Sequence, residues 1–114
     1  NTIQREWYDQ TKLTDAIRQE YLKLLKIENW DRAFYELTFA PAYPELRPLL
    51  PQLTVPVFIV AGQEDRLIRA FYFEAIATEI PGAQLTLIPQ CGHVPQEECP
   101  IQFMEEIIKY LDTQ

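Results

Sequence analysis

The stretch that decides the fold is Val55-Pro56-Val57-Phe58-Ile59-Val60-Ala61-Gly62-Gln63-Glu64-Asp65. Its residues 55–61 form a nearly continuous apolar run, rich in β-branched side chains, that ends at Gly62. Such a run predicts a strand of a parallel sheet, because a strand of that kind is covered on both faces. A second, shorter strand is expected over residues 84–88, where apolar residues alternate with polar ones.

Helical patterns follow each of the two expected strands. Apolar residues recur at helical spacing from Phe73 to Ile80, and the Pro-Gly pair at 81–82 stops that helix. Residues 89–98 are expected to be a loop, and Pro100 suits the first position of a final helix that extends to Leu111. The order strand, helix, strand, helix predicts two parallel strands joined by a right-handed crossover.

Residues 1–45 are patterned differently, since eight of the fourteen aromatic residues lie within the first 43 positions. Thr14 is a good N-cap for one helix, and a second helix is expected from Asn29 to Pro41. Prolines then recur through residues 46–54, which we interpret as a linker. We therefore divide the chain into a helical segment (1–45), a proline-rich linker (46–54) and a strand–helix unit (55–114).

The composition excludes several classes of protein. The 114 residues suffice for one modest domain, and a formal net charge of -7 argues against nucleic-acid and membrane-surface partners. No stretch approaches the ~20 apolar residues of a membrane span. Two cysteines, Cys91 and Cys99, are too few for a disulfide framework; they could pair with each other, but reduced thiols and a cytoplasmic location are the simpler expectation. The chain contains no serine, which excludes a serine nucleophile within these residues.

Two short polar motifs follow the two expected strands. One is the stretch 62–65, which ends in Asp65, and the other is Gly92-His93. Adjacent parallel strands end at the same edge of a sheet, so Asp65 and His93 should emerge side by side. A carboxylate beside an imidazole fixes its tautomer and stabilises its charged form, as a general base requires. Glu64 is the alternative orienting acid.

Three spaced motifs carry a resemblance to a known family. They are Ala61-Gly-x-x-Asp65 after the strand, Ile80-Pro-Gly-Ala, and Cys91-Gly-His93-x-Pro-x-x-Glu98-x-Pro100. Over roughly residues 50–111 the sequence resembles the C-terminal part of the α/β-hydrolase fold. The implied fold class is α/β: the C-terminal βαβα end of that family's parallel sheet, preceded by a helical cap-like segment. Nucleophile, acid and base follow one another along such chains, which makes Asp65 the acid and His93 the base.

The family's other catalytic parts have no counterpart in these residues. The G-x-S-x-G elbow that bears the nucleophile is absent, and so is the loop that completes the oxyanion hole. We therefore expect a fragment that is inactive alone. Its parent would act on a small apolar substrate, either an ester or, with an aspartate nucleophile, a haloalkane or epoxide. No cofactor and no metal are implied, and Trp30, Phe34 and Tyr35 are the candidate pocket residues.

Three alternatives remain open for the chemistry and the partners. Cys91 could serve as a nucleophile, or join His93 and Cys99 in a zinc site, although its spacing suits neither role. The chain could instead be a non-catalytic module that self-associates or pairs with an N-terminal half through its open strand edge at residues 55–60. It could also be one chain of a two-chain hydrolase. Glu98 is interpreted as a carboxylate at a helix N-terminus.

Overall fold

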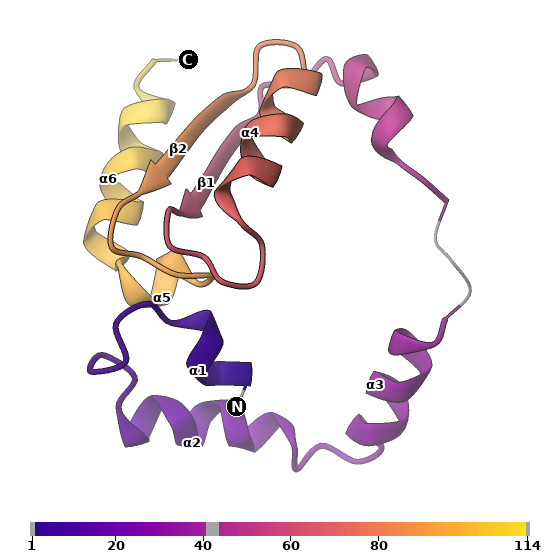
Figure 1. Cartoon of the computed structure of the whole chain (residues 1–114), viewed down its shortest axis with the longest axis vertical. Coiled ribbons are helices and arrows are strands. Elements are labelled where there is room, and N and C mark those ends of the chain that lie inside the picture. The colour runs from indigo at the N-terminus through magenta and orange to yellow at the C-terminus, as the bar shows by residue number, and fades with distance from the viewer. Residues whose placement is uncertain (1, 41–43, 114) are drawn as a thin grey trace.

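A two-stranded parallel sheet organises the second half of the chain. In the computed structural model, which describes residues 2–40 and 44–113, β1 (Phe58–Gly62) pairs with β2 (Gln84–Ile88). The helix α4 (Ala70–Glu79) connects the strands, and α6 (Pro100–Leu111) follows them. Both helices contact both strands, and Figure 1 shows the sheet between them. The predicted βαβα order is confirmed.

The element bounds follow from local sequence. β1 begins at Phe58 rather than at residue 55, because Pro56 has no N–H to donate to a ladder. The carbonyl of Val57 already accepts a hydrogen bond from the Gln84 N–H, at 3.0 Å. α4 ends immediately before Ile80 and the Pro-Gly pair, as predicted. The segment expected to be a loop contains a short helix, α5 (Pro95–Glu98), so that expectation was wrong there.

The α-helices that precede the sheet in the described residues are α1 (Thr2–Glu6), α2 (Asp15–Leu24) and α3 (Trp30–Thr38). The Thr14 hydroxyl caps α2 by accepting a hydrogen bond from the Ile17 N–H, at 3.3 Å. Pro41, at which the sequence predicts the end of the second helix, lies outside the described residues. The proline-rich stretch contains a 3-10 helix, η1 (Arg47–Gln52), with Pro48 near its start and Pro51 inside it.

The described chain is open in shape. α2 and α3 extend away from the sheet and the chain returns to it through η1 (Figure 1). The Cα radius of gyration is 16.6 Å, against about 13 Å for a compact domain of this length. The buried apolar residues are few: Trp7, Leu13, Ala61, Ile80, Ile88, Cys91 and Cys99. Among the described helices, none combines the length and apolar composition needed to cross a membrane.

Candidate active site

The structure brings Asp65 and His93 together beyond the carboxyl ends of the two strands. Asp65 Oδ2 lies 2.8 Å from His93 Nδ1, although 28 positions separate the two residues. The Asp65 side chain is 2% exposed and that of His93 is 32% exposed. A buried carboxylate therefore faces one ring nitrogen, while part of the ring is open to solvent. With Nδ1–H donated to Asp65, a neutral ring carries its free lone pair on Nε2.

The loop after β1 fixes the Asp65 carboxylate. Its second oxygen, Oδ1, accepts hydrogen bonds from the N–H groups of Leu67 and Ile68, at 2.7 and 2.9 Å. The Asp65 N–H donates to the Gly62 carbonyl at 3.3 Å, which closes the turn. Both carboxylate oxygens are thus occupied, and one of them is directed at His93. These hydrogen bonds, together with the contact to His93, hold the carboxylate in one orientation.

Glu64 makes a different connection. Its Oε2 accepts a hydrogen bond from the Cys91 N–H at 3.1 Å, while the Glu64 N–H donates to the Cys91 carbonyl at 3.0 Å. Glu64 therefore ties the loop after β1 to the loop after β2. The carboxylate that bonds to His93 belongs to Asp65. The Glu64 carboxylate bonds instead to the backbone of Cys91, two residues before His93.

Gly62 allows the two strand-end loops to lie in backbone contact, and Gly92 allows the loop after β2 to lie against the N-terminal segment. A Cβ on Gly62 would lie 2.0 Å from the Gly92 carbonyl oxygen, and a Cβ on Gly92 would lie 2.4 Å from the Glu6 carbonyl oxygen. Neither distance is possible for a real side chain, so both positions require glycine. The Gly62 contact sets the separation of the two strand-end loops, and with it the approach of Asp65 to His93.

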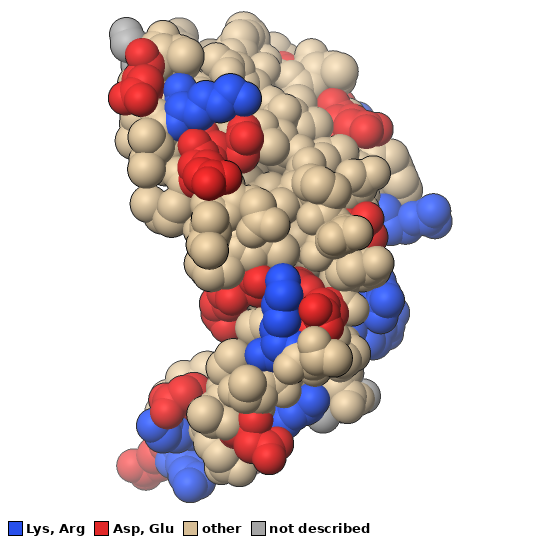
Figure 2. Space-filling model, turned by 90° about the vertical axis from the view of Figure 1, so that its left-hand side faces the viewer, with Lys and Arg blue, Asp and Glu red and all other residues tan. Residues whose placement is uncertain are grey.

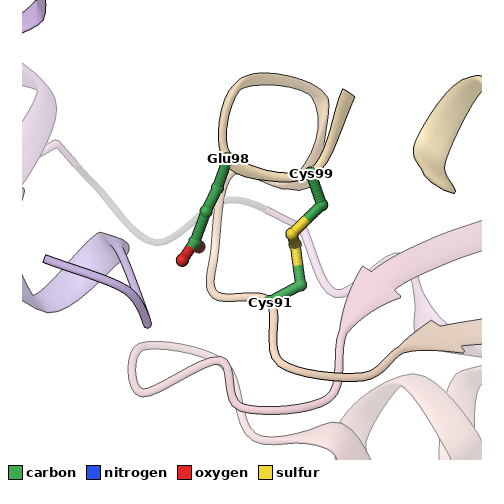
Figure 3. Close-up of side chains that lie close together, drawn as sticks. All are labelled: Cys91, Glu98 and Cys99. Atoms are coloured by element: carbon green, nitrogen blue, oxygen red, sulfur yellow. A yellow bond between two sulfur atoms is a disulfide. The ribbon is translucent and has the colours of Figure 1, made fainter. Parts of the chain in front are cut away.

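The two cysteines are bonded to each other, which corrects the expectation of reduced thiols. Cys91 and Cys99 form a disulfide whose Cα atoms are 6.3 Å apart, within the usual bridging range. Figure 3 shows this bond joining the loop after β2 to the turn that precedes α6. A sulfur in a disulfide is neither a nucleophilic thiolate nor a zinc ligand. The group formed by Cys91, Glu98 and Cys99 is therefore not a metal site in this state.

Sequence reasoning identified Glu98 but missed its long-range contacts. It is 2% exposed, and its carboxylate accepts hydrogen bonds from three backbone N–H groups, those of Tyr8, Asp9 and Gly92. Glu98 does stand just before α6, as expected from the sequence, but the hydrogen-bond partners of its carboxylate lie outside that helix. Two of them are 90 and 89 positions away, and no local pattern predicts contacts at that distance.

The three aromatic pocket candidates lie on α3. Trp30 and Phe34 line an open, apolar hollow of about 410 Å³ between α2 and α3, together with Leu24, Leu25, Ile27, Ala33 and Leu37. Tyr35 packs against Phe39 instead, with ring centroids 4.6 Å apart. The residues that line this hollow include neither Asp65 nor His93. A role for Trp30, Phe34 and Tyr35 in substrate binding stays a prediction.

Comparisons with known proteins identify the family and the fold. The model of the Alpha/beta hydrolase family matches residues 2–106. The 2-succinyl-6-hydroxy-2,4-cyclohexadiene-1-carboxylate synthase of Salmonella arizonae is 30% identical over 116 residues. That alignment covers 97% of this chain and 44% of the synthase. The chain thus spans less than half the length of this relative.

Two solved structures are similar to the chain. A thermophilic esterase from Thermogutta terrifontis is 34% identical with a TM-score of 0.59, over 61% of this chain and 26% of the esterase. An esterase from Exiguobacterium antarcticum has a TM-score of 0.75 at 19% identity, over 96% of this chain and 40% of that one. The second comparison shows that the helical segment and the strand–helix unit occur together in one fold.

Proposed function

The chain belongs to the alpha/beta hydrolase family, and we propose that it contributes the acid and the base of a catalytic triad that hydrolyses small apolar esters. The observation that carries the proposal is the 2.8 Å contact between Asp65 Oδ2 and His93 Nδ1 beyond the strand ends. Nucleophile, acid and base follow in that order along chains of this fold. Asp65 precedes His93, as the acid should precede the base.

The proposed nucleophile is a serine outside these 114 residues. The chain has no serine. Its alignment with the Salmonella arizonae synthase includes 97% of this chain but only 44% of the synthase. The two backbone donors of the oxyanion hole belong, in this proposal, to the same missing part of the enzyme. The 114 residues alone should therefore show negligible ester turnover.

In the proposed reaction His93 acts first as a general base and then as a general acid. Its Nε2 takes the proton of the serine hydroxyl as the oxygen attacks the ester carbonyl carbon, and a tetrahedral oxyanion forms. The imidazolium then gives that proton to the leaving alkoxide, which departs as an alcohol. His93 then takes a proton from a water molecule, which attacks the acyl-enzyme carbonyl carbon. The proton passes to the serine oxygen, and the carboxylic acid product is released. Asp65 holds the ring in the required tautomer and stabilises its charged form throughout.

Ester hydrolysis is preferred over the other chemistry that this pair would serve. With an aspartate nucleophile, His93 would activate water against an alkyl-enzyme ester, as haloalkane or epoxide substrates require. The structural relative that is 34% identical is an esterase, and that similarity favours the serine mechanism. The aromatic hollow on α2 and α3 is apolar, which suits a substrate of low polarity.

The test uses a protein that carries these residues together with the coding sequence upstream of Asn1. We expect that sequence to contain a G-x-S-x-G elbow after an apolar strand, and the protein to hydrolyse short-chain p-nitrophenyl esters. His93→Ala and Asp65→Asn should each lower kcat by about 10⁴. Glu64→Gln is the control, because it removes a neighbouring carboxylate that bonds to the Cys91 N–H and not to His93. Ester hydrolysis that survives His93→Ala would refute the proposal, and halide release from haloalkanes would select the aspartate mechanism.

A further inference from the structure

Glu98 lies where the loop that bears His93 meets the N-terminal segment 6–9. We propose that Glu98 is a positioning residue, which holds His93 at its distance from Asp65 by fixing the backbone of Gly92. This inference rests on the proposed function, since it takes His93 as the base, and it adds the group that places that base.

The Glu98 carboxylate joins two segments that are far apart in the chain. Oε2 accepts hydrogen bonds from the Gly92 N–H at 2.7 Å and the Tyr8 N–H at 3.1 Å. Oε1 accepts from the Asp9 N–H at 2.6 Å. Figure 3 shows the carboxylate extending away from the disulfide and toward the N-terminal ribbon. One side chain therefore connects the loop that bears His93 with the N-terminal segment 6–9.

Burial makes this connection strong. A carboxylate that is almost completely removed from water is tolerated only where hydrogen bonds replace its hydration, and three N–H groups do so here. Each of those N–H groups would in turn be left unsatisfied if the acceptor were lost. The carboxylate and the three donors thus form a unit in which a single change leaves several polar groups without partners.

Other contacts join the same two segments. The His93 N–H donates to the Glu6 carbonyl at 2.6 Å, and Lys12 Nζ donates to the Glu98 carbonyl at 3.1 Å. The loop after β1, which bears Asp65, also contacts segment 6–9, because Arg66 Cζ lies 6.0 Å from the centre of the Tyr8 ring. Segment 6–9 therefore contacts both strand-end loops. Glu98 is its buried, hydrogen-bonded link to the base, through the residue that precedes His93.

The test takes advantage of His93 being the single histidine of the chain. In the 114-residue protein, the Nδ1 proton that bridges His93 and Asp65 should give one far-downfield NMR resonance at low temperature. Glu98→Gln removes the charge and replaces one acceptor oxygen by an NH₂ group, which faces N–H donors. We expect that resonance to broaden or disappear, and the amides of Tyr8, Asp9 and Gly92 to exchange about 10- to 100-fold faster.

Glu97→Gln is the matched control. It is the same substitution at the neighbouring position of α5, where the side chain is exposed and its Oε2 accepts a hydrogen bond from the Tyr21 hydroxyl. This variant should keep both the resonance and the slow exchange. A purely structural role for Glu98 would speed exchange in β2 and α6 as well, and would leave the His93 resonance of the folded protein unchanged. That pattern would overturn the proposal.

A measurement on the unmodified protein covers the case in which Glu98→Gln does not fold. The three amides bound to one carboxylate should then be protected to a similar degree, and rapid exchange at Tyr8, Asp9 and Gly92 would refute the inference. These readouts do not depend on turnover. In the protein that also carries the upstream coding sequence, the resonance without ester hydrolysis would retain the positioning role and reject the reaction. An unchanged resonance in Glu98→Gln would reject the role of Glu98 alone.

Discussion

Gly62 and Gly92 show at the scale of single residues how the candidate site is assembled. Gly62 ends β1, and the absent side chain lets the Cys91 and Gly92 carbonyls lie directly against it. That contact permits the two hydrogen bonds between Glu64 and Cys91, and it brings the following residue, Asp65, within reach of His93. The glycine of this motif is therefore required by packing between two loops.

Replacing Gly62 with alanine should separate the loops. The new methyl group would meet two backbone carbonyls, which cannot move aside as a flexible side chain can. We expect a loss of about 1–3 kcal/mol in the free energy of unfolding, together with loss of the far-downfield His93 resonance. Urea unfolding and NMR measure the two effects.

Gly82→Ala provides the matched control for this substitution. Gly82 has a φ of +72°, and a Cβ added to it would meet nothing within 4 Å, so alanine there introduces backbone strain and no clash. It should cost about 1–2 kcal/mol and leave the His93 resonance intact. Equal effects of the two variants on that resonance would contradict the packing argument.

The sequence predicts the meeting of Asp65 and His93 because it depends on one rule: adjacent parallel strands end at the same edge. Each residue follows a recognisable strand, so its place is set by the element before it. Glu98 differs, because its role depends on the N–H groups of Tyr8 and Asp9 at the other end of the chain. No spacing within residues 91–100 indicates those partners, and Pro100 instead suggests a helix N-terminus.

At the scale of elements, the long helices and the strands follow from local signals. Thr14 caps α2, and the Pro-Gly pair at 81–82 stops α4. The short elements α1, α5 and η1 were not predicted. A helix of one turn has few internal hydrogen bonds and forms where tertiary contacts hold it, as the Glu98 hydrogen bonds hold α5 against the N-terminal segment.

One contact between elements predicts a pH dependence. The Tyr21 hydroxyl of α2 donates to Glu97 Oε2 of α5 at 2.8 Å. Burial, together with this hydrogen bond and the Glu97 charge, raises the pKa of Tyr21 from 10.0 to about 12. The folded state thus holds the phenol proton more tightly than the unfolded chain. Its contribution to stability is complete below pH 10 and is lost as the pH rises to about 12.

Tyr21→Phe should reveal this contribution. The stability difference between the unmodified protein and the variant should be constant up to pH 10 and then shrink toward pH 12. The other tyrosines ionise in both proteins, so their effects cancel in the comparison. Urea unfolding at several pH values measures the difference. A difference that stays constant through pH 12 would show that Tyr21 titrates at its ordinary pKa.

The disulfide closes the segment that contains both His93 and Glu98. A crosslink over a loop of this length lowers the entropy of the unfolded chain, which corresponds to about 2.5 kcal/mol of stability. Dithiothreitol should therefore decrease the free energy of unfolding by about that amount. The double variant Cys91→Ala/Cys99→Ala should be insensitive to the reductant. Equal unfolding curves for the unmodified protein in the two redox conditions would contradict this prediction.

At the scale of the whole molecule, the described chain leaves much apolar surface in contact with water. β1 has one strand neighbour, so its other edge is open within the described residues. The outer side of α6 carries a stripe at helical spacing, with Ile101 72% exposed and Ile108 53% exposed. Figure 2, which looks from the α6 side, shows a broad uncharged area between charged groups at both ends of this face. Surfaces of this kind are normally covered by protein.

We therefore predict that the 114-residue chain associates as its concentration rises, and that Ile101→Lys/Ile108→Lys weakens this association. Sedimentation velocity over a range of concentrations measures both. The control is Gln102→Lys/Thr78→Lys, which adds the same charge at polar positions and should leave association unchanged. Both double variants bring the net charge of -7 closer to zero, which by itself would promote association. A decrease specific to the stripe variant can therefore be attributed only to the lost apolar surface, whereas a monomer at all concentrations would show that α6 needs no covering.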